Sequence, residues 1–394
     1  MTVYTFRMSA KKNGKRLFEI VSFFIYDLGR AVDLNKAQEA VREAGFPADD
    51  YLPTEKRKVQ SRDTPASLSL PTPFCFPVGE SGYEKIVDVH AEIKIYDDGA
   101  MTIVIRERGR FRIDNLADAA ARPVVRVGGE DLNIASWAAR LFRHVNEGTA
   151  KAIVAPVSDE RRDEESYTAF CLLDPPTDVE SFFAEHRDEI AALIIGEKNR
   201  PRLHSGQINA ALSRPFSYRA DDLSVFDMDR CFIIEPRGDY EDILLIAEHA
   251  NYRLLELRAL DRLLDLRLEE AENDLVGYGV SKRNTPSKEA SPSAKFARIQ
   301  TLRFEALFIL ENLENSSKII GDFYLCQIYD RLCEIFNTEG WKRSVERRLD
   351  ILESVYDMAK TDTAQQRQLV LEIVFIAVCV IFPVLQIAQA LIQK

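Results

Sequence analysis

The last two dozen residues constrain the architecture of this chain most. Within residues 369–392, the segment Ile373–Leu385 (IVFIAVCVIFPVL) contains no polar side chain. A helix of 24 residues is about 36 Å long, enough to cross a hydrocarbon core of about 30 Å. The strictly apolar part is also typical in length of a buried core helix. We therefore predict a C-terminal transmembrane helix over residues 369–392, with a packed core or oligomer helix as the alternative. The side chains expected to face lipid are Ile373, Phe375, Val378, Ile381, Phe382 and Leu385.

Basic residues are concentrated before the apolar segment, whereas Lys394 alone follows it. This asymmetry predicts a single-pass, tail-anchored protein with its N-terminal bulk on the cytoplasmic side of a bacterial inner membrane or its organellar equivalent. The N-terminus agrees, because MTVYTFRMSAKKNGKRLF has no apolar core of a secretion signal. The densest basic cluster suits anionic lipid headgroups, and a solvated helix face explains it equally well. Its members are Lys342, Arg343, Arg347 and Arg348.

Composition narrows the class of protein. The 394 residues, of which 46% are hydrophobic, are sufficient for two or three domains with a sizeable core. The net charge of −11 argues against broad nucleic-acid binding, which requires many lysine and arginine contacts to phosphate. The six cysteines include no C-x-x-C pair, so we expect free buried thiols and no cofactor.

The first 236 residues show mixed strand and helix patterns. Residues 87–108 predict a β-hairpin, because both arms alternate apolar and polar residues around the turn sequence Asp97-Asp98-Gly99. Residues 49–77 resemble a long loop. Strands are predicted over 3–8, 17–26, 152–157, 167–173 and in a pair within 217–235; helices are predicted from Leu34, over 132–145 and over 178–195. We expect one α+β head domain over 1–236, with two lobes that divide near 120–130 as the alternative.

From residue 240 the pattern changes to long helices. We predict a long helix over 240–276, a flexible Pro/Ser/Lys-rich linker over 277–294 and a helical bundle or coiled coil over 295–368. The predicted fold class is therefore α+β: a mixed α/β head, long C-terminal helices in a hairpin or coiled coil, and the transmembrane helix. The positions expected to pack between helices or between copies are Leu254, Leu257, Asp261, Leu264, Leu268, Leu349, Leu352 and Tyr356.

Asp261 occupies a position in the heptad seam where an apolar residue is usual. A carboxylate there must be paired or its pKa rises, and such a residue often fixes helix register. Arginines on the same helix, or Arg347 and Arg348 on the last helix, are candidate partners. The alternative is that the seam drifts locally and Asp261 is solvated.

Catalytic motifs are missing from the sequence. There is no H-E-x-x-H, G-x-S-x-G, P-loop or G-x-G-x-x-G, and no histidine pair is spaced for a helix-borne metal site. Asp227 and Asp229 form the best acidic pair, because two carboxylates at i and i+2 of a strand point the same way and could hold a divalent cation. A water-exposed strand face explains them as well.

The C-terminal helices resemble a known family. The stretches AEHANYRLLELRALDRLLD (Ala247–Asp265), IGDFYLCQIYDRLCEIF (Ile320–Phe336) and WKRSVERRLDILESVYD (Trp341–Asp357) are similar to helices of the membrane-anchored family related to the regulators of meiotic nuclear division. The similarity covers mainly residues 192–380. It implies a single-pass membrane protein with an α+β head and no established catalytic residues. A mitochondrial relative is linked to organellar translation as an oligomeric scaffold.

These features together predict a non-enzymatic, membrane-anchored, self-associating scaffold that presents its head to a cytoplasmic protein. Two alternatives come from other classes. The first is a membrane-tethered factor that associates with ribosomes or RNA, for which only local basic residues and the mitochondrial analogy argue. The second is a metal-dependent hydrolase built on Asp227 and Asp229 in the head.

Overall fold

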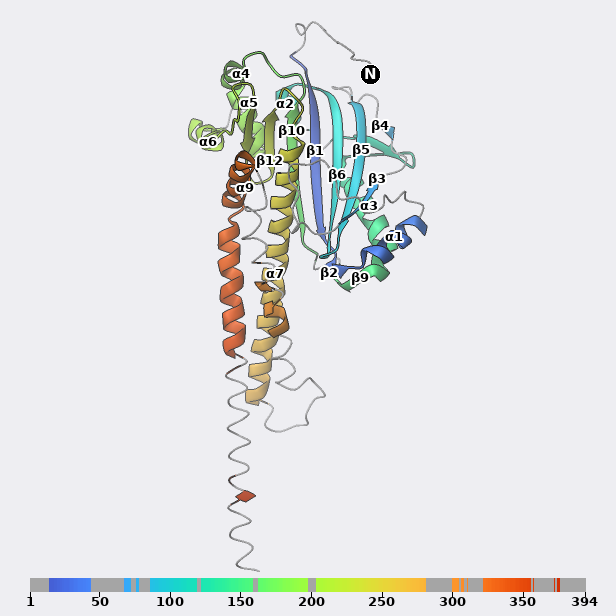
Figure 1. Ribbon diagram of the computed structural model, residues 1–394, viewed down its shortest axis with the longest axis vertical. Coiled ribbons are helices and arrows are strands. Elements are labelled where there is room, and N and C mark those ends of the chain that lie inside the picture. Colours follow the sequence, from blue (N-terminus) through green and yellow to red (C-terminus); the bar gives the residue numbers. More distant parts are fainter. Residues whose placement is uncertain are drawn as a thin grey trace, which may run out of the picture. The chain divides into compact units, whose positions relative to one another are not determined.

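The computed structural model describes most of the head and parts of the C-terminal helices (Figure 1). The described residues are 14–43, 67–71, 76–77, 86–118, 122–158, 162–197, 203–280, 300–304, 306–307, 310, 322–355, 357, 372 and 374–375. The chain forms two compact units. The head unit is Met1–Ala259 with Asn312–Glu339, and the helical unit is Leu260–Glu311 with Gly340–Lys394.

A seven-stranded sheet forms the centre of the head. Its order is β11 (Leu223–Phe226), β12 (Arg230–Ile234), β10 (Glu164–Leu172), β1 (Arg16–Asp27), β6 (Ala100–Phe111), β5 (Ile86–Tyr96) and β3 (Ser67–Pro71). Only β10 and β12 pair in parallel; the other neighbours are antiparallel. The hairpin predicted over 87–108 is confirmed as β5 and β6. Two small sheets flank this one: β2 (Gly29–Val32) with β9 (Ile153–Pro156), and β4 (Phe76–Pro77) with β7 (Val125–Val127) and β8 (Glu130–Leu132).

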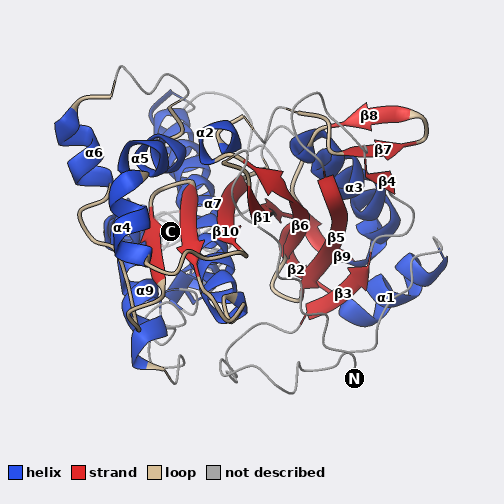
Figure 2. Cartoon of the chain, turned by 90° about the horizontal axis from the view of Figure 1, so that it is seen from above, coloured by secondary structure: helices blue, strands red, loops and turns tan. Residues whose placement is uncertain are grey.

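One face of the sheet carries two apolar cores, because alternate residues of β1 point to the same side. Phe18 and Ile20 belong to a core with β10, β12 and the helices α2 (Ile113–Leu116), α4 (Val179–Glu185) and α5 (Arg187–Ile195). Tyr26 belongs to the other core, with β5, β6 and the helices α1 (Leu34–Glu43) and α3 (Ile134–Thr149). Figure 2 shows the two groups of helices at opposite ends of the sheet. The short helices α6 (Ser205–Ala211) and η2 (Ala150–Ala152) complete this part.

The opposite face of β1 contacts the first part of α7 (Glu241–Val280) through charged groups as well as apolar ones. Glu19 is fully buried and accepts hydrogen bonds from Arg106, Arg108 and the Tyr240 hydroxyl. Arg106 also donates two hydrogen bonds of 2.6 Å to Glu241. Charged hydrogen bonds in a poorly hydrated site are stronger than neutral ones, so this network fixes where α7 begins on the sheet.

His249 on α7 lies between two aromatic rings, Tyr252 of the same helix and Tyr329 of α9 (Phe323–Ile335). Burial, and then the charge of Arg253, lowers the pKa of His249 to about 3. The neutral ring is therefore required in the folded state, whereas the unfolded chain takes up a proton at about pH 6.5.

This shift gives a testable pH dependence. Because the unfolded state binds more protons below pH 6.5, stability must fall as the pH drops, by about 2 kcal/mol at pH 5 from His249 alone. We expect His249→Phe, which keeps the ring packing, to reduce the difference in unfolding free energy between pH 7 and pH 5 by about that amount. Urea titrations at both pH values measure it. An equal loss of stability in both proteins would show that His249 does not contribute.

The structure corrects several predictions for the head. Residues 49–77 were expected to form a long loop, but they contain the strands β3 and β4. Both strands are short and lie among prolines and serines, so the strand pattern is weak in the sequence. The single helix expected over 178–195 is two helices, α4 and α5, separated at His186. The predicted strand over 3–8 and the linker residues 281–294 lie outside the described residues.

Apolar contacts and a charged cluster join the described helices of the helical unit. Leu264, Val345 and Leu352 are fully buried. Asp261 pairs with Arg348, whose Nε also lies 2.9 Å from Oδ1 of Asp265. Of the two alternatives for Asp261, the structure therefore shows the paired carboxylate with one of the predicted partners. This ion pair joins α7 to the helix over residues 338–355 within one chain.

The α+β class with C-terminal helices is confirmed, whereas the transmembrane helix is not shown. Within the described ranges, no helix is both long enough and apolar enough to cross a bilayer. Most of the apolar segment 369–392, including Ile373, Val378, Ile381, Phe382 and Leu385, lies outside the residues that the structure describes. Phe375 is described, and its side chain is 68% exposed.

Candidate functional site

An acidic, tyrosine-lined pocket lies in the described part of the head. It spans about 590 Å³ of space, part of which is open solvent. The loop before β11, the end of β12 and the first turns of α7 and α9 form its walls. Its lining includes five carboxylates, Asp222, Glu235, Asp239, Asp242 and Asp322, and a single basic side chain, Arg219.

Local backbone requirements place three of these carboxylates. Asp222 accepts hydrogen bonds from the backbone N–H groups of Tyr218 and Arg219, at 2.8 and 3.2 Å, and so folds the loop before β11. Asp322 is the N-cap of α9 and accepts from the N–H groups of its first turn at 2.8 and 3.2 Å. Glu235 accepts from the N–H of Arg237 at 3.0 Å. The pocket is therefore acidic partly because its walls are turns and helix starts that favour acidic caps.

Two tyrosines form an aromatic wall of the pocket. The rings of Tyr218 and Tyr324 are 5.4 Å apart, and the Tyr218 side chain is 67% exposed. Burial, and then the charge of Asp222, raises the pKa of Tyr324 to about 12, so its hydroxyl stays protonated at neutral pH. Phe323, next to Asp322 and Tyr324 in the sequence, is 79% exposed but does not line the pocket. Large aromatic side chains in solvent are typical of surfaces that bind a partner.

The chemistry of this pocket favours a cation. Carboxylates accept charge-assisted hydrogen bonds from guanidinium and ammonium groups, and tyrosine faces attract such cations. The chain supplies one example, because the Arg219 guanidinium lies 5.8 Å from the centre of the Tyr218 ring. For a metal ion the arrangement is poor: in the described part of the chain, no group of three or more His, Cys, Asp or Glu residues is placed to hold one.

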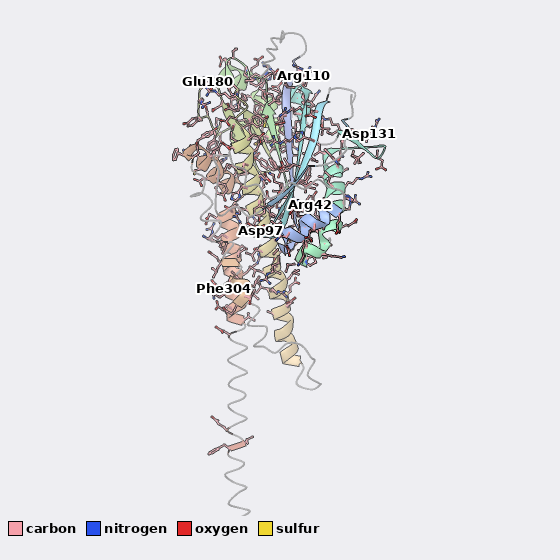
Figure 3. All side chains as sticks on the ribbon, turned by 45° about the vertical axis from the view of Figure 1, so that its right-hand side comes forward. Arg42, Asp97, Arg110, Asp131, Glu180 and Phe304 are labelled. Carbon is pink, nitrogen blue, oxygen red and sulfur yellow. The ribbon has the colours of Figure 1, made fainter. Side chains whose placement is uncertain are left out.

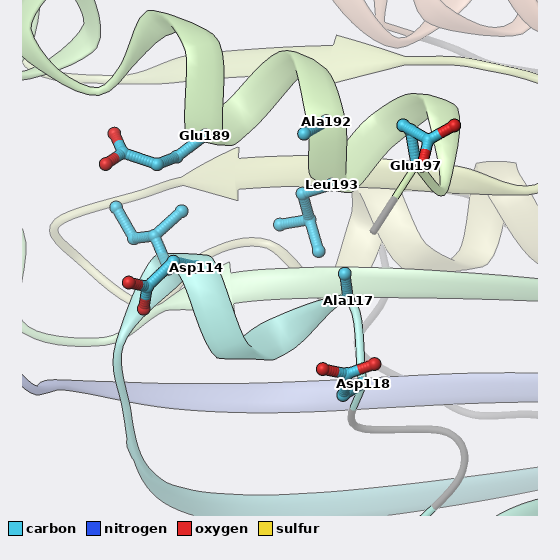
Figure 4. Close-up of a pocket in the computed structure, with 8 residues that line it drawn as sticks. Asp114, Ala117, Asp118, Glu189, Ala192, Leu193 and Glu197 are labelled. Carbon is cyan, nitrogen blue, oxygen red and sulfur yellow. The ribbon is translucent and has the colours of Figure 1, made fainter. Parts of the chain in front are cut away.

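A second recess of about 270 Å³ lies between α2 and α5 (Figure 4). Asp114, Asp118, Glu189 and Glu197 line it around an apolar floor of Ala117, Ala192 and Leu193. Arg112 donates to Asp114 at 2.8 and 3.0 Å, and the Nδ1 of His186 lies 3.0 Å from Glu189. These local partners offset part of the negative charge of the second recess, and no aromatic side chain lines this recess.

The predicted metal candidates, Asp227 and Asp229, line neither of these two recesses. Asp227 and Asp229 lie in the turn between β11 and β12, not side by side on a strand as expected. The Asp227 carboxylate accepts from the N–H of Met228 at 2.8 Å, and the carbonyl of Asp229 accepts from the N–H of Thr168 at 2.9 Å. The Asp227 side chain stabilises the turn, the Asp229 carbonyl bonds to β10, and neither residue lines the pocket.

The predicted packing residues are mostly buried within the chain itself. Leu254, Leu257, Leu264, Leu349 and Leu352 are buried, Asp261 is buried with Arg348, and Leu268 is half-buried. The side chain of Tyr356 lies outside the described residues. A role for these positions between copies stays a prediction.

The predicted headgroup contacts differ from one another in exposure. Arg343 and Arg347 are exposed and Lys342 is half-buried, whereas Arg348 is committed to Asp261 and Asp265. Arg348 is therefore a poor candidate for lipid contact, because its guanidinium is already paired. Contact of the other three with headgroups stays a prediction.

The head defines an α+β domain with an acidic recess, and comparison with known proteins assigns it to a family. Residues 18–241 match the family model described as "Uncharacterized protein MJ0711, N-terminal domain", so the chain belongs to that family. The matched range begins in β1 and ends at the first residue of α7. The similarity to the family related to the regulators of meiotic nuclear division, drawn from the helices over 192–380, was wrong, because the family shown is a different one.

One relative is uncharacterized protein MJ0711 of Methanocaldococcus jannaschii, which is 25% identical over 228 residues. The match spans 57% of this chain and 66% of that protein, just under two thirds of the relative's length. No solved structure matches the chain.

Proposed function

We propose that the protein is a non-enzymatic, membrane-anchored interaction protein whose head binds a basic side chain of a partner in the acidic, tyrosine-lined pocket. The observation that carries the proposal is the lining of this pocket: five carboxylates, one arginine and two tyrosines. The lining carries more negative than positive side chains, and backbone N–H groups bind several of the carboxylates. The fitting partner is an arginine- or lysine-rich segment of another protein.

The aromatic residues distinguish this pocket from an ordinary acidic surface. An exposed carboxylate cluster is usually just solvated, whereas this pocket also has the exposed Tyr218 ring in its lining. A guanidinium that enters the pocket gains contact with the Tyr218 ring and charge-assisted hydrogen bonds at the same time. Each contribution is about 0.5–3 kcal/mol, which suits a reversible interaction.

The membrane anchor rests on the C-terminal apolar segment. Val374 and Phe375 are the described apolar residues of this segment, and both are exposed in the isolated chain. Exposed apolar side chains within a run of thirteen apolar residues need a covering, and lipid supplies it. The ribosome-associated and hydrolase alternatives stay predictions without an arrangement of described residues in their favour.

One flotation experiment tests both parts of the proposal. The full chain is mixed with neutral phosphatidylcholine vesicles and a fluorescent hexa-arginine peptide, then centrifuged through a density gradient. We expect protein and peptide to float together. Tyr218→Ala should weaken peptide binding about tenfold, because the ring face is lost, while Tyr218→Phe should retain most of it. A chain that ends after Thr363 should stay at the bottom and still bind peptide.

The second acidic recess provides the matched control. Asp118→Asn removes a carboxylate from the same head and should leave peptide binding unchanged, whereas Asp242→Asn in the tyrosine-lined pocket should weaken it. Equal binding by the Tyr218→Ala and Asp118→Asn proteins would remove the pocket from the proposal. Flotation of the chain that ends after Thr363 would remove the anchor.

A further inference from the structure

The helical unit displays apolar side chains on its outside. On the helical segment near residue 305, Leu302, Ala306 and Leu310 are spaced by four residues and buried. Phe304 (Figure 3), in the same segment, is 74% exposed, and Leu307 is also exposed. On the helix over 338–355, Ile351 is 41% exposed. Phe304, Leu307 and Ile351 are large apolar side chains exposed on these two helical segments, and a covered surface would explain them.

Charges on the outer face of the helix over 338–355 are sorted to its two edges. Residues four apart advance only about 40° around a helix, so they form stripes. Arg343, Arg347 and Ile351 make one stripe, and Glu346 and Asp350 make the other; all five are exposed. One edge of this face is therefore basic and ends at Ile351, and the other is acidic.

The segment that carries Phe304 lies at the acidic edge. Glu353, next to Glu346 on that side of the helix, accepts from Gln300 at 3.4 Å and pairs with Arg303. Phe304 and Leu307 therefore lie beyond the acidic stripe, and Ile351 lies beyond the basic stripe. Across the outer face the order is apolar, acidic, basic and apolar.

We propose that a second copy of this chain covers this face, in a parallel two-fold pair. A two-fold axis parallel to the helices brings the basic edge of one copy against the acidic edge of the other. Arg347 of each copy then meets Asp350 of its partner, and Ile351 meets Phe304 and Leu307. An antiparallel pair would place like edges together, with repulsion between like charges.

The parallel orientation rests on the proposed function, because two chains anchored by their C-termini in one membrane point the same way. Confinement to the membrane also raises the local concentration of each chain for the other. The interface is isologous, so both copies contribute both edges, and association stops at a dimer.

Charge exchange between two variants tests this pairing on the full chain. Sedimentation equilibrium in detergent measures the dissociation constant of the pair. Arg347→Glu alone and Asp350→Arg alone should each raise it about tenfold or more, because each places like charges together. A mixture of these two variants should associate as tightly as the original chain, since both contacts are then complementary. Arg267→Glu, an exposed control on α7, should have no effect.

Tight association of the mixed variants requires contact between residues 347 and 350 of two copies. A structural effect of either substitution within its own chain would persist in the mixture. An original chain that stays monomeric in detergent, or single variants that associate like the original, would overturn the pairing. Vesicle flotation and peptide binding test the proposed function and are measured separately from dimer formation. Loss of the dimer would therefore leave the proposed function intact, and loss of the proposed function would leave the dimer of this face intact.

Discussion

Replacing Glu19 by alanine should lower the free energy of unfolding by about 3–5 kcal/mol, one of the largest effects available in this chain. Glu19 is fully buried in β1 and accepts hydrogen bonds at 3.3 Å from Arg106, 2.7 Å from Arg108 and 2.6 Å from the Tyr240 hydroxyl. Its removal leaves the poorly hydrated Arg106 with Glu241 alone and leaves the Tyr240 hydroxyl without its acceptor. Urea titration followed by circular dichroism measures the loss.

An exposed pair of similar geometry provides the control. Arg126 donates two hydrogen bonds to Asp131, at 2.6 and 3.1 Å, on the surface of the head (Figure 3). Asp131→Ala should cost less than about 1 kcal/mol, because water solvates Arg126 once its partner is gone. Similar costs for the Glu19 and Asp131 variants would mean that water reaches Glu19 in solution and that the network does not hold α7.

Glu19 also shows where prediction from sequence ends. The strand over 17–26 could be predicted from its aromatic and β-branched residues, and the hairpin over 87–108 from its alternation, because both are local signals. Nothing near Glu19 in the sequence indicates that it is buried. Its partners are 87, 89 and 221 residues away, and only the fold brings them together.

The pocket was missed for a related reason. Its carboxylates are spread from Asp222 to Asp322, and three of them have a local explanation as a turn or helix cap. The capping signal could be recognised, but not the meeting of four separate segments. The family was misjudged because amphipathic helices share leucine, arginine and glutamate at helical spacing. Such patterns report helix packing more than descent.

Gly99→Ala should also cost about 3 kcal/mol or more, since it disturbs the backbone rather than a side chain. Gly99 ends the turn between β5 and β6 with φ of +104°, a conformation that side chains rarely adopt. A Cβ there would lie far inside contact distance of the Gly29 carbonyl oxygen. Gly29 has its own close neighbour in Ala155, and Leu28 donates to the Gly99 carbonyl at 2.8 Å. The turn can therefore make room for a Cβ only if Gly29 and the backbone around Ala155 also move. Thermal or urea unfolding measures the cost.

The cost of Gly99→Ala has two contributions, the positive φ and the steric overlap of the added Cβ, and Gly129→Ala separates them. Gly129 has φ of +87° in the turn between β7 and β8, and a Cβ there would meet nothing within 4 Å. Its replacement should therefore cost only the backbone conformation, about 1 kcal/mol. The difference between the two variants measures the close packing of the β5–β6 turn on β2. Equal costs would show that this turn moves freely in solution and that only the positive φ requires glycine at position 99.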